Sequence, residues 1–109
     1  MAYDERLADK VRDALNEQTP TSERKMFGAL VFMVEGNMCC GVTSENLLLR
    51  LGPEGSEVAV SRPHVQPMKM RDKTMRGFVF VEPEGFAEDG ELQEWIDEAL
   101  DFVRTLPPK

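Results

Sequence analysis

The longest apolar region of the chain, residues 26–51, alternates in a way that predicts three consecutive antiparallel strands. In residues 27–34 both alternating sets are apolar, which is typical of a strand in the middle of a sheet. The turn at residues 35–38 places Gly36 and Asn37 where a two-residue hairpin needs positive φ. This region is therefore expected to organise the fold.

The second and third strands of this region are predicted to place different side chains on the two faces of the sheet. Strict alternation in residues 38–43 puts Met38 on the same face as Cys40 and puts Cys39 on the other, so the two thiols are predicted to point to opposite sides of the sheet. After another turn, residues 47–51 form the third strand, with leucine on both faces.

An amphipathic helix is predicted near the N-terminus. Leu7, Val11 and Leu15 are spaced at i, i+4 and i+8, and charged residues occupy most of the intervening positions. Asp4 is the expected N-cap, and the helix should end before Pro20.

A second amphipathic helix is predicted from residue 90 to about residue 106, with Asp89 as its cap. Its acidic residues form one face, and its opposite face is a wide apolar stripe of Leu92, Trp95, Ile96, Ala99, Leu100, Val103 and Leu106. This helix is expected to contribute the largest single share of the core.

The remaining segments are shorter. Residues 19–25 are interpreted as a polar link, and residues 53–60 as a short helix with proline in its first turn. Two prolines precede an expected edge strand at residues 67–71, a turn occupies residues 72–76, and residues 77–81 form the last of five strands.

This order of elements predicts an α+β fold. We expect a two-layer sandwich, in which N- and C-terminal helices pack on a mainly antiparallel sheet of about five strands. The chain of 109 residues has the size of one domain, so residues 1–109 are assigned to a single domain. No stretch is apolar enough to span a membrane or act as a secretory leader, which makes the cytoplasm the expected location.

The net charge of −7 opposes binding to nucleic acid, so direct nucleic-acid binding is not expected. The charge is unevenly distributed, because residues 62–76 contain five basic residues and one acidic residue. This segment suits a small anion or an acidic protein surface. The alternative is that it balances the acidic C-terminal helix, since charge runs are usually solvated.

Cationic side chains suggest a ligand-binding site. Arg50, Arg62 and His64, with Lys25 or Arg76, would form an anion or carboxylate pocket if the third strand lies beside the segment that carries His64. The alternative is a surface loop held by prolines, because no spacing rule forces these side chains together.

The two cysteines and the only histidine raise the question of thiol or metal chemistry. A thiol enzyme using Cys39 or Cys40 with His64 is a third reading, but the pair has no sequence signature. Adjacent thiols on opposite faces of a strand would not grip one zinc ion. Core packing is therefore preferred for Cys40, and no metal or cofactor is predicted.

Methionines are numerous in the expected strands. They are interpreted as core filling or, alternatively, as an adaptable face that binds a partner. The residues concerned are Met26, Met33, Met38, Met68, Met70 and Met75.

Several short motifs occur together in a familiar order: KMFGALVFMVEGNMCCGV, LLLRLGPE, RPHVQPM, MRGFVFVEPEG and LQEWIDEAL. With these motifs the sequence resembles the TfoX (Sxy) N-terminal domain family over nearly its whole length. The resemblance implies a small α+β domain that occurs alone or as the first half of bacterial competence regulators. It supplies no catalytic residues, and the competence role itself belongs to the two-domain proteins.

The function expected from these observations is a noncatalytic regulatory or protein-interaction module in a transcription-related context. We expect a stand-alone member of the family with a protein partner, such as a transcription regulator, or a homodimer. The alternative is a small-anion or ligand-binding domain that uses Arg50, Arg62 and His64.

Overall fold

The computed structural model of the chain describes residues 3–26, 28–70, 73–88 and 90–108. Its six-stranded sheet has the order β1-β2-β3-β4-β6-β5, and every neighbouring pair is antiparallel. The strands are β1 (Ser22–Met26), β2 (Ala29–Val34), β3 (Asn37–Thr43), β4 (Asn46–Arg50), β5 (Val65–Met70) and β6 (Lys73–Val81). The helices are α1 (Glu5–Asn16), α2 (Gly52–Ala59), the 3₁₀ turn η1 (Pro83–Phe86) and α3 (Glu91–Val103). The predicted α+β class with a mainly antiparallel sheet is confirmed.

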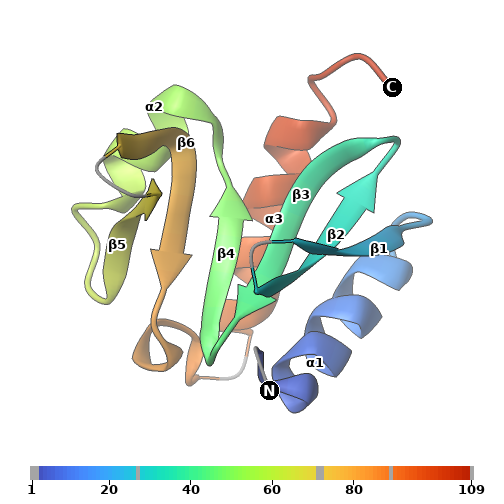
Figure 1. Cartoon of the computed structure of the whole chain (residues 1–109), viewed down its shortest axis with the longest axis horizontal. Coiled ribbons are helices and arrows are strands. Elements are labelled where there is room, and N and C mark those ends of the chain that lie inside the picture. Colours follow the sequence, from blue (N-terminus) through green and yellow to red (C-terminus); the bar gives the residue numbers. More distant parts are fainter. Residues whose placement is uncertain (1–2, 27, 71–72, 89, 109) are drawn as a thin grey trace.

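Helices α1 and α3 form the second layer. Figure 1 shows both helices on the same side of the sheet, with α3 behind β3 and β4. The apolar stripe of each helix is buried there, and Leu15, Ile96 and Leu100 are fully buried. We call this cluster, which lies between the two helices and the sheet, the helix-side core.

Hydrogen bonds cap α1 and attach α3 to the preceding turn. As predicted, the Asp4 carboxylate caps α1, because its Oδ1 accepts from the backbone N–H groups of Arg6 and Leu7 at 2.8 and 3.2 Å. The indole N–H of Trp95 donates to the carbonyl of Gly85 at 3.0 Å, which ties α3 to η1. The predicted cap of α3, Asp89, lies outside the described residues.

The sixth strand, β1, was not predicted. Residues 19–25 were interpreted as a polar link, but Ser22–Met26 pairs along its whole length with β2. The prediction was wrong because β1 is an edge strand whose first four side chains are exposed, so it shows no apolar alternation. Its presence places β2 between two neighbours, which confirms the inner position predicted for that strand.

The two hairpin turns differ from the prediction in detail. Positive φ occurs at Glu35 (51°) and Gly36 (82°) rather than at Gly36 and Asn37. Asn37 instead begins β3, where it is buried and donates from Nδ2 to the carbonyl of Pro107 at 3.0 Å. The predicted turn at residues 72–76 is also too long, because β6 already begins at Lys73.

A β-bulge in β3 changes the faces of its side chains. Phe32 pairs with Cys40, but the next residue, Met33, pairs with Met38, which leaves Cys39 as the extra residue. Both cysteines therefore join the helix-side core, and each is 0 % exposed. The prediction that their thiols point to opposite sides was wrong, since strict alternation does not survive a bulge.

Candidate functional site

The face of the sheet turned away from α1 and α3 is apolar, and in the described part of the chain neither of these helices lies over it (Figure 1). It is lined by residues from all six strands. We call it the open face, and its lining residues are Met26, Ala29, Val31, Met38, Thr43, Leu48, Met68, Met75, Phe78 and Phe80.

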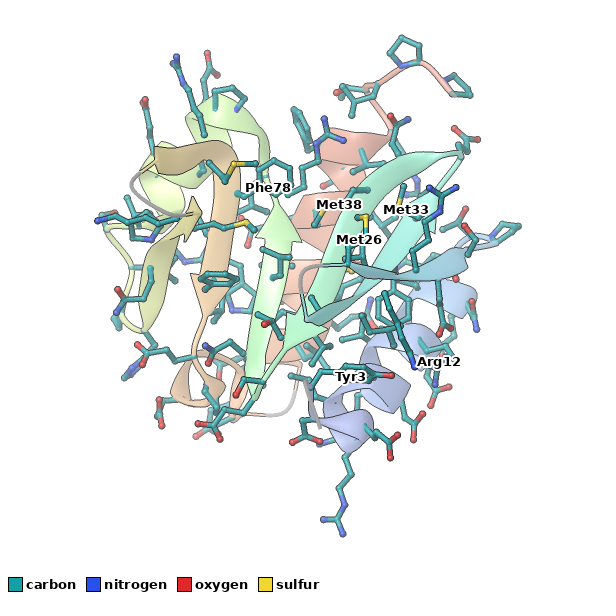
Figure 2. The ribbon with its side chains drawn as sticks, in the orientation of Figure 1. Tyr3, Arg12, Met26, Met33, Met38 and Phe78 are labelled. Carbon is teal, nitrogen blue, oxygen red and sulfur yellow. The ribbon has the colours of Figure 1, made fainter. Side chains whose placement is uncertain are left out.

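The open face is a shallow hollow with an inner floor and a more exposed wall. Ala29, Val31 and Leu48 form the floor and are at most 5 % exposed. Among the methionines and phenylalanines around them, Met68 is buried and the others are half-buried, and Figure 2 shows the labelled Met26, Met38 and Phe78 in front of the ribbon. The hollow holds about 90 Å³. One water needs roughly 10–15 Å³, so there is room for part of a partner's apolar side chain.

Charge is segregated between the two sides of the sheet. The only acidic residue in the six strands is Glu23. It lies opposite Phe32 on the helix side, and its carboxylate accepts two hydrogen bonds from Arg12 of α1 at 2.6 and 2.8 Å. The open face is bordered by two cations, because the register places Arg24 beside Val31 and Arg50 beside Phe78.

Arg50 is held at the border of the open face by aromatic rings. Its guanidinium carbon lies 5.7 Å from the ring centre of Phe78 and 5.7 Å from that of Phe102. One of its nitrogens donates to the carbonyl of Met38 at 3.4 Å. Among the described residues no carboxylate lies within ion-pair distance of this half-buried cation.

Arg62 has a different environment from Arg50. Its guanidinium carbon stacks 3.8 Å from the ring centre of Trp95, and Nη1 forms a 3.0 Å ion pair with Glu98 of α3. Arg62 is therefore engaged with the acidic helix, in agreement with the charge-balancing alternative for its segment.

The other predicted ligand residues are also dispersed. His64 is exposed and has a positive φ of 66°, and its carbonyl accepts from the N–H of Glu82. Arg76 lies 3.9 Å from Glu57 of α2, and Lys25 is exposed on β1 at the far edge of the sheet.

The sheet order separates Arg50 from His64. Strand β6 lies between β4, which carries Arg50, and β5, which follows His64. The two segments are therefore not the neighbours that the predicted pocket required. From strand spacing and rise, their backbones are about 15 Å apart. The structure thus does not bring the five predicted cations into one pocket, and anion binding by any of them stays a prediction.

The cysteines are inaccessible in this fold. The pKa of Cys40 is raised well above its ordinary value by its hydrogen bond with Cys39 and by burial, which both favour the neutral thiol. Core packing, which was preferred for Cys40, is confirmed. Within the described residues, no three His, Cys, Asp or Glu side chains are grouped so that they could hold a metal ion.

A larger hollow of about 470 Å³ lies between α1 and η1. It is lined by both cations and carboxylates, including Arg6, Lys10, Glu45 and Glu88, so neither sign of charge dominates. The open face has the more uniform chemistry, which makes it the stronger candidate for a binding surface.

One signal for the open face was present in the sequence. Methionines had been interpreted as core filling or as an adaptable partner-binding face, and Met26, Met38, Met68 and Met75 all line the hollow. Periodicity alone could not separate these two interpretations, because the bulge at Cys39 decides on which face Met38 lies.

Comparison with known proteins identifies one family. The family model of the TfoX N-terminal domain matches residues 13–103, which include every strand, the whole of α3 and the last turn of α1. No curated protein and no solved structure gave a significant match. No helix in the described ranges has the length and apolar character needed to cross a membrane.

Proposed function

Because the chain belongs to the TfoX N-terminal domain family, we propose that it is a noncatalytic regulatory module that binds another protein through the open face of its sheet. The proposed setting is the cytoplasm, and a transcription-related partner is the context that the family resemblance favours. The observation that carries the proposal is the apolar hollow on the side of the sheet opposite α1 and α3.

The composition of the open face supports a protein ligand. Unbranched methionine side chains adapt to different partner shapes, and aromatic side chains contribute a large contact area. Here the methionines and phenylalanines surround a floor of smaller, buried residues. A partner that inserts one apolar anchor would displace water from this apolar surface, which is the usual energetic centre of an interface.

Charge favours a different protein over a second copy of this chain. The open face is bordered by Arg24 and Arg50 and has no acidic lining residue. Two copies meeting face to face would bring like charges together, and each chain carries a net charge of −7. An apolar and acidic surface of another protein complements the open face better.

Site-specific photo-crosslinking tests the proposal. The photoreactive residue p-benzoylphenylalanine would replace Phe80 on the open face and, as a control, the exposed Asp101 on α3. We expect a distinct protein to be crosslinked from position 80 but not from position 101 in a bacterial lysate. The protein is then identified, purified and shown to bind the full chain.

Two outcomes contradict the proposal. Crosslinks from position 101 alone would place the partner on the helix side instead. Crosslinks from position 80 only to another copy of the chain, together with a dimer in light scattering, would assign the open face to self-association.

A further inference from the structure

We infer that Arg50 determines the specificity of the open face by binding a carboxylate on an amphipathic acidic helix of the partner. This inference rests on the proposed function, because it names the chemistry of the partner that the open face would take. It goes beyond that function by assigning a defined role to one side chain.

The hydrogen-bonding state of Arg50 is the first argument. A guanidinium has five N–H donors, and Arg50 uses one of its nitrogens in a single 3.4 Å bond to the carbonyl of Met38. The side chain is half-buried, and no carboxylate of the described residues neutralises it. A docked partner would remove more of its water, so an opposing carboxylate would be strongly favoured.

The rigidity of Arg50 is the second argument. Phe78 and Phe102 hold its planar group from two elements, β6 and α3, at 5.7 Å each. A guanidinium placed between two aromatic rings is partly oriented before the partner arrives, so less side-chain entropy is lost when a two-pronged contact to a carboxylate forms. Arg62 offers a contrast, because it lies closer to one aromatic ring, at 3.8 Å from the centre of Trp95, and already has Glu98 as a partner.

Position relative to the hollow is the third argument. Arg50 contacts Phe78 and Met38, and both of these residues line the hollow. A carboxylate on Arg50 would thus lie close to an apolar anchor in the hollow. On a helix, side chains three or four positions apart are about 5–6 Å apart, so one helical turn matches this arrangement. The expected motif is a large apolar residue with Asp or Glu three or four positions away.

Selection from a random peptide library tests the inference. Displayed 16-residue peptides would be selected on the immobilised full chain and, in parallel, on Arg50→Gln. Peptides selected on the wild-type chain should carry the apolar–acidic motif, whereas peptides selected on Arg50→Gln should keep the apolar anchor without the acidic enrichment.

Affinities of one selected peptide and its Glu→Gln analogue then give a double-mutant cycle. On the wild-type chain the analogue should bind about tenfold more weakly or worse, as expected for loss of a charged hydrogen-bonded pair. On Arg50→Gln the two peptides should bind equally. Arg6→Gln, which removes an exposed arginine from α1, is the matched control and should behave as the wild type.

The outcomes separate this inference from the proposed function. Peptides that depend on Phe80 but lack acidic enrichment would overturn the role of Arg50 and leave the open face as a docking site. The role of Arg50 would also be overturned if the Glu→Gln change in the peptide weakened binding to Arg50→Gln as much as it weakens binding to the wild-type chain. Failure to select any peptide whose binding depends on Phe80 would overturn the proposed function together with the inference.

Discussion

At the scale of single residues, the environment of a side chain decides its role more than its type does. Arg50 and Arg62 both lie within cation–π distance of aromatic rings, yet only Arg62 also has a carboxylate partner among the described residues. The Arg62–Glu98 pair is largely exposed, and such pairs contribute little to stability. Arg50, in contrast, is half-buried and has no carboxylate of the described residues within ion-pair distance.

Cys40 gives a residue-scale prediction about pH. Its pKa is raised in the folded chain, so the neutral thiol is favoured there. The resulting stabilisation is complete at pH values below the pKa of the thiol in the unfolded chain, which is about 8.5. This contribution should be lost as pH rises above that value. In urea denaturation, the free energy of unfolding should fall between pH 7.5 and pH 10 more steeply for the wild-type chain than for Cys40→Ala.

The same burial predicts that both thiols are unreactive in the native chain. Ellman's reagent at neutral pH should modify neither Cys39 nor Cys40 until denaturant is added, because each is fully buried. Rapid modification of one thiol in the native state would contradict the core assignment and would revive the thiol-enzyme reading.

At the scale of elements, α3 is anchored in the helix-side core by Trp95. Trp95 is 3 % exposed, and it packs into the helix-side core while its indole N–H bonds Gly85. Trp95→Ala should lower the free energy of unfolding by about 3–5 kcal/mol, measured by denaturant titration. Trp95→Phe keeps most of the packing and should cost clearly less. An unchanged denaturation midpoint in Trp95→Ala would refute the packing described for α3.

Strand β1 is held to α1 by the contact between Arg12 and Glu23. The hydrogen bond from Arg12 lowers the pKa of Glu23. The stabilisation by this pair is therefore present at pH values above the pKa of a glutamate in the unfolded chain, about 4.3, and is lost as the pH falls below it. Glu23→Gln should therefore speed amide hydrogen exchange in β1 at neutral pH and leave β4 unchanged. Equal exchange in β1 of both proteins would show that the pair does not hold the strand.

The comparison of sequence and structure is clearest for individual elements. Apolar spacing predicted both long helices, because each has apolar residues at the helical period. Val11 in the first and Leu100 in the second belong to these sets and are buried. It missed β1, because an edge strand with exposed charges lacks that pattern. It also misplaced Cys39, because a bulge adds a residue without any signature in composition.

The candidate site was less predictable than the fold. Arg50 was chosen from the sequence, but its proposed neighbour His64 lies beyond an intervening strand. Sheet order depends on long-range pairing, which local residue patterns do not specify. The methionines gave a usable signal, although their common face depends on the same long-range pairing.

At the scale of the whole molecule, acidic residues are concentrated outside the sheet. The chain has 20 acidic residues, and only Glu23 lies in a strand. The two sides of the molecule therefore differ in chemistry, with the acidic helix α3 on one and an apolar surface bordered by arginines on the other. Under the proposed function, this asymmetry favours an acidic partner that approaches the side of the sheet bordered by arginines.

The central claim is that the open face binds the partner, and matched phenylalanine variants test it most directly. Phe80 lines the open face, whereas Phe86 is packed against the helix-side core, and both are half-buried. Calorimetric titration of the crosslinked and purified partner would be performed on Phe80→Gln and Phe86→Gln, after denaturation has shown that both variants are folded. We predict that Phe80→Gln weakens binding about tenfold or more. Phe86→Gln should retain the wild-type affinity. Equal affinities for Phe80→Gln and the wild type, or a loss confined to Phe86→Gln, would contradict the account.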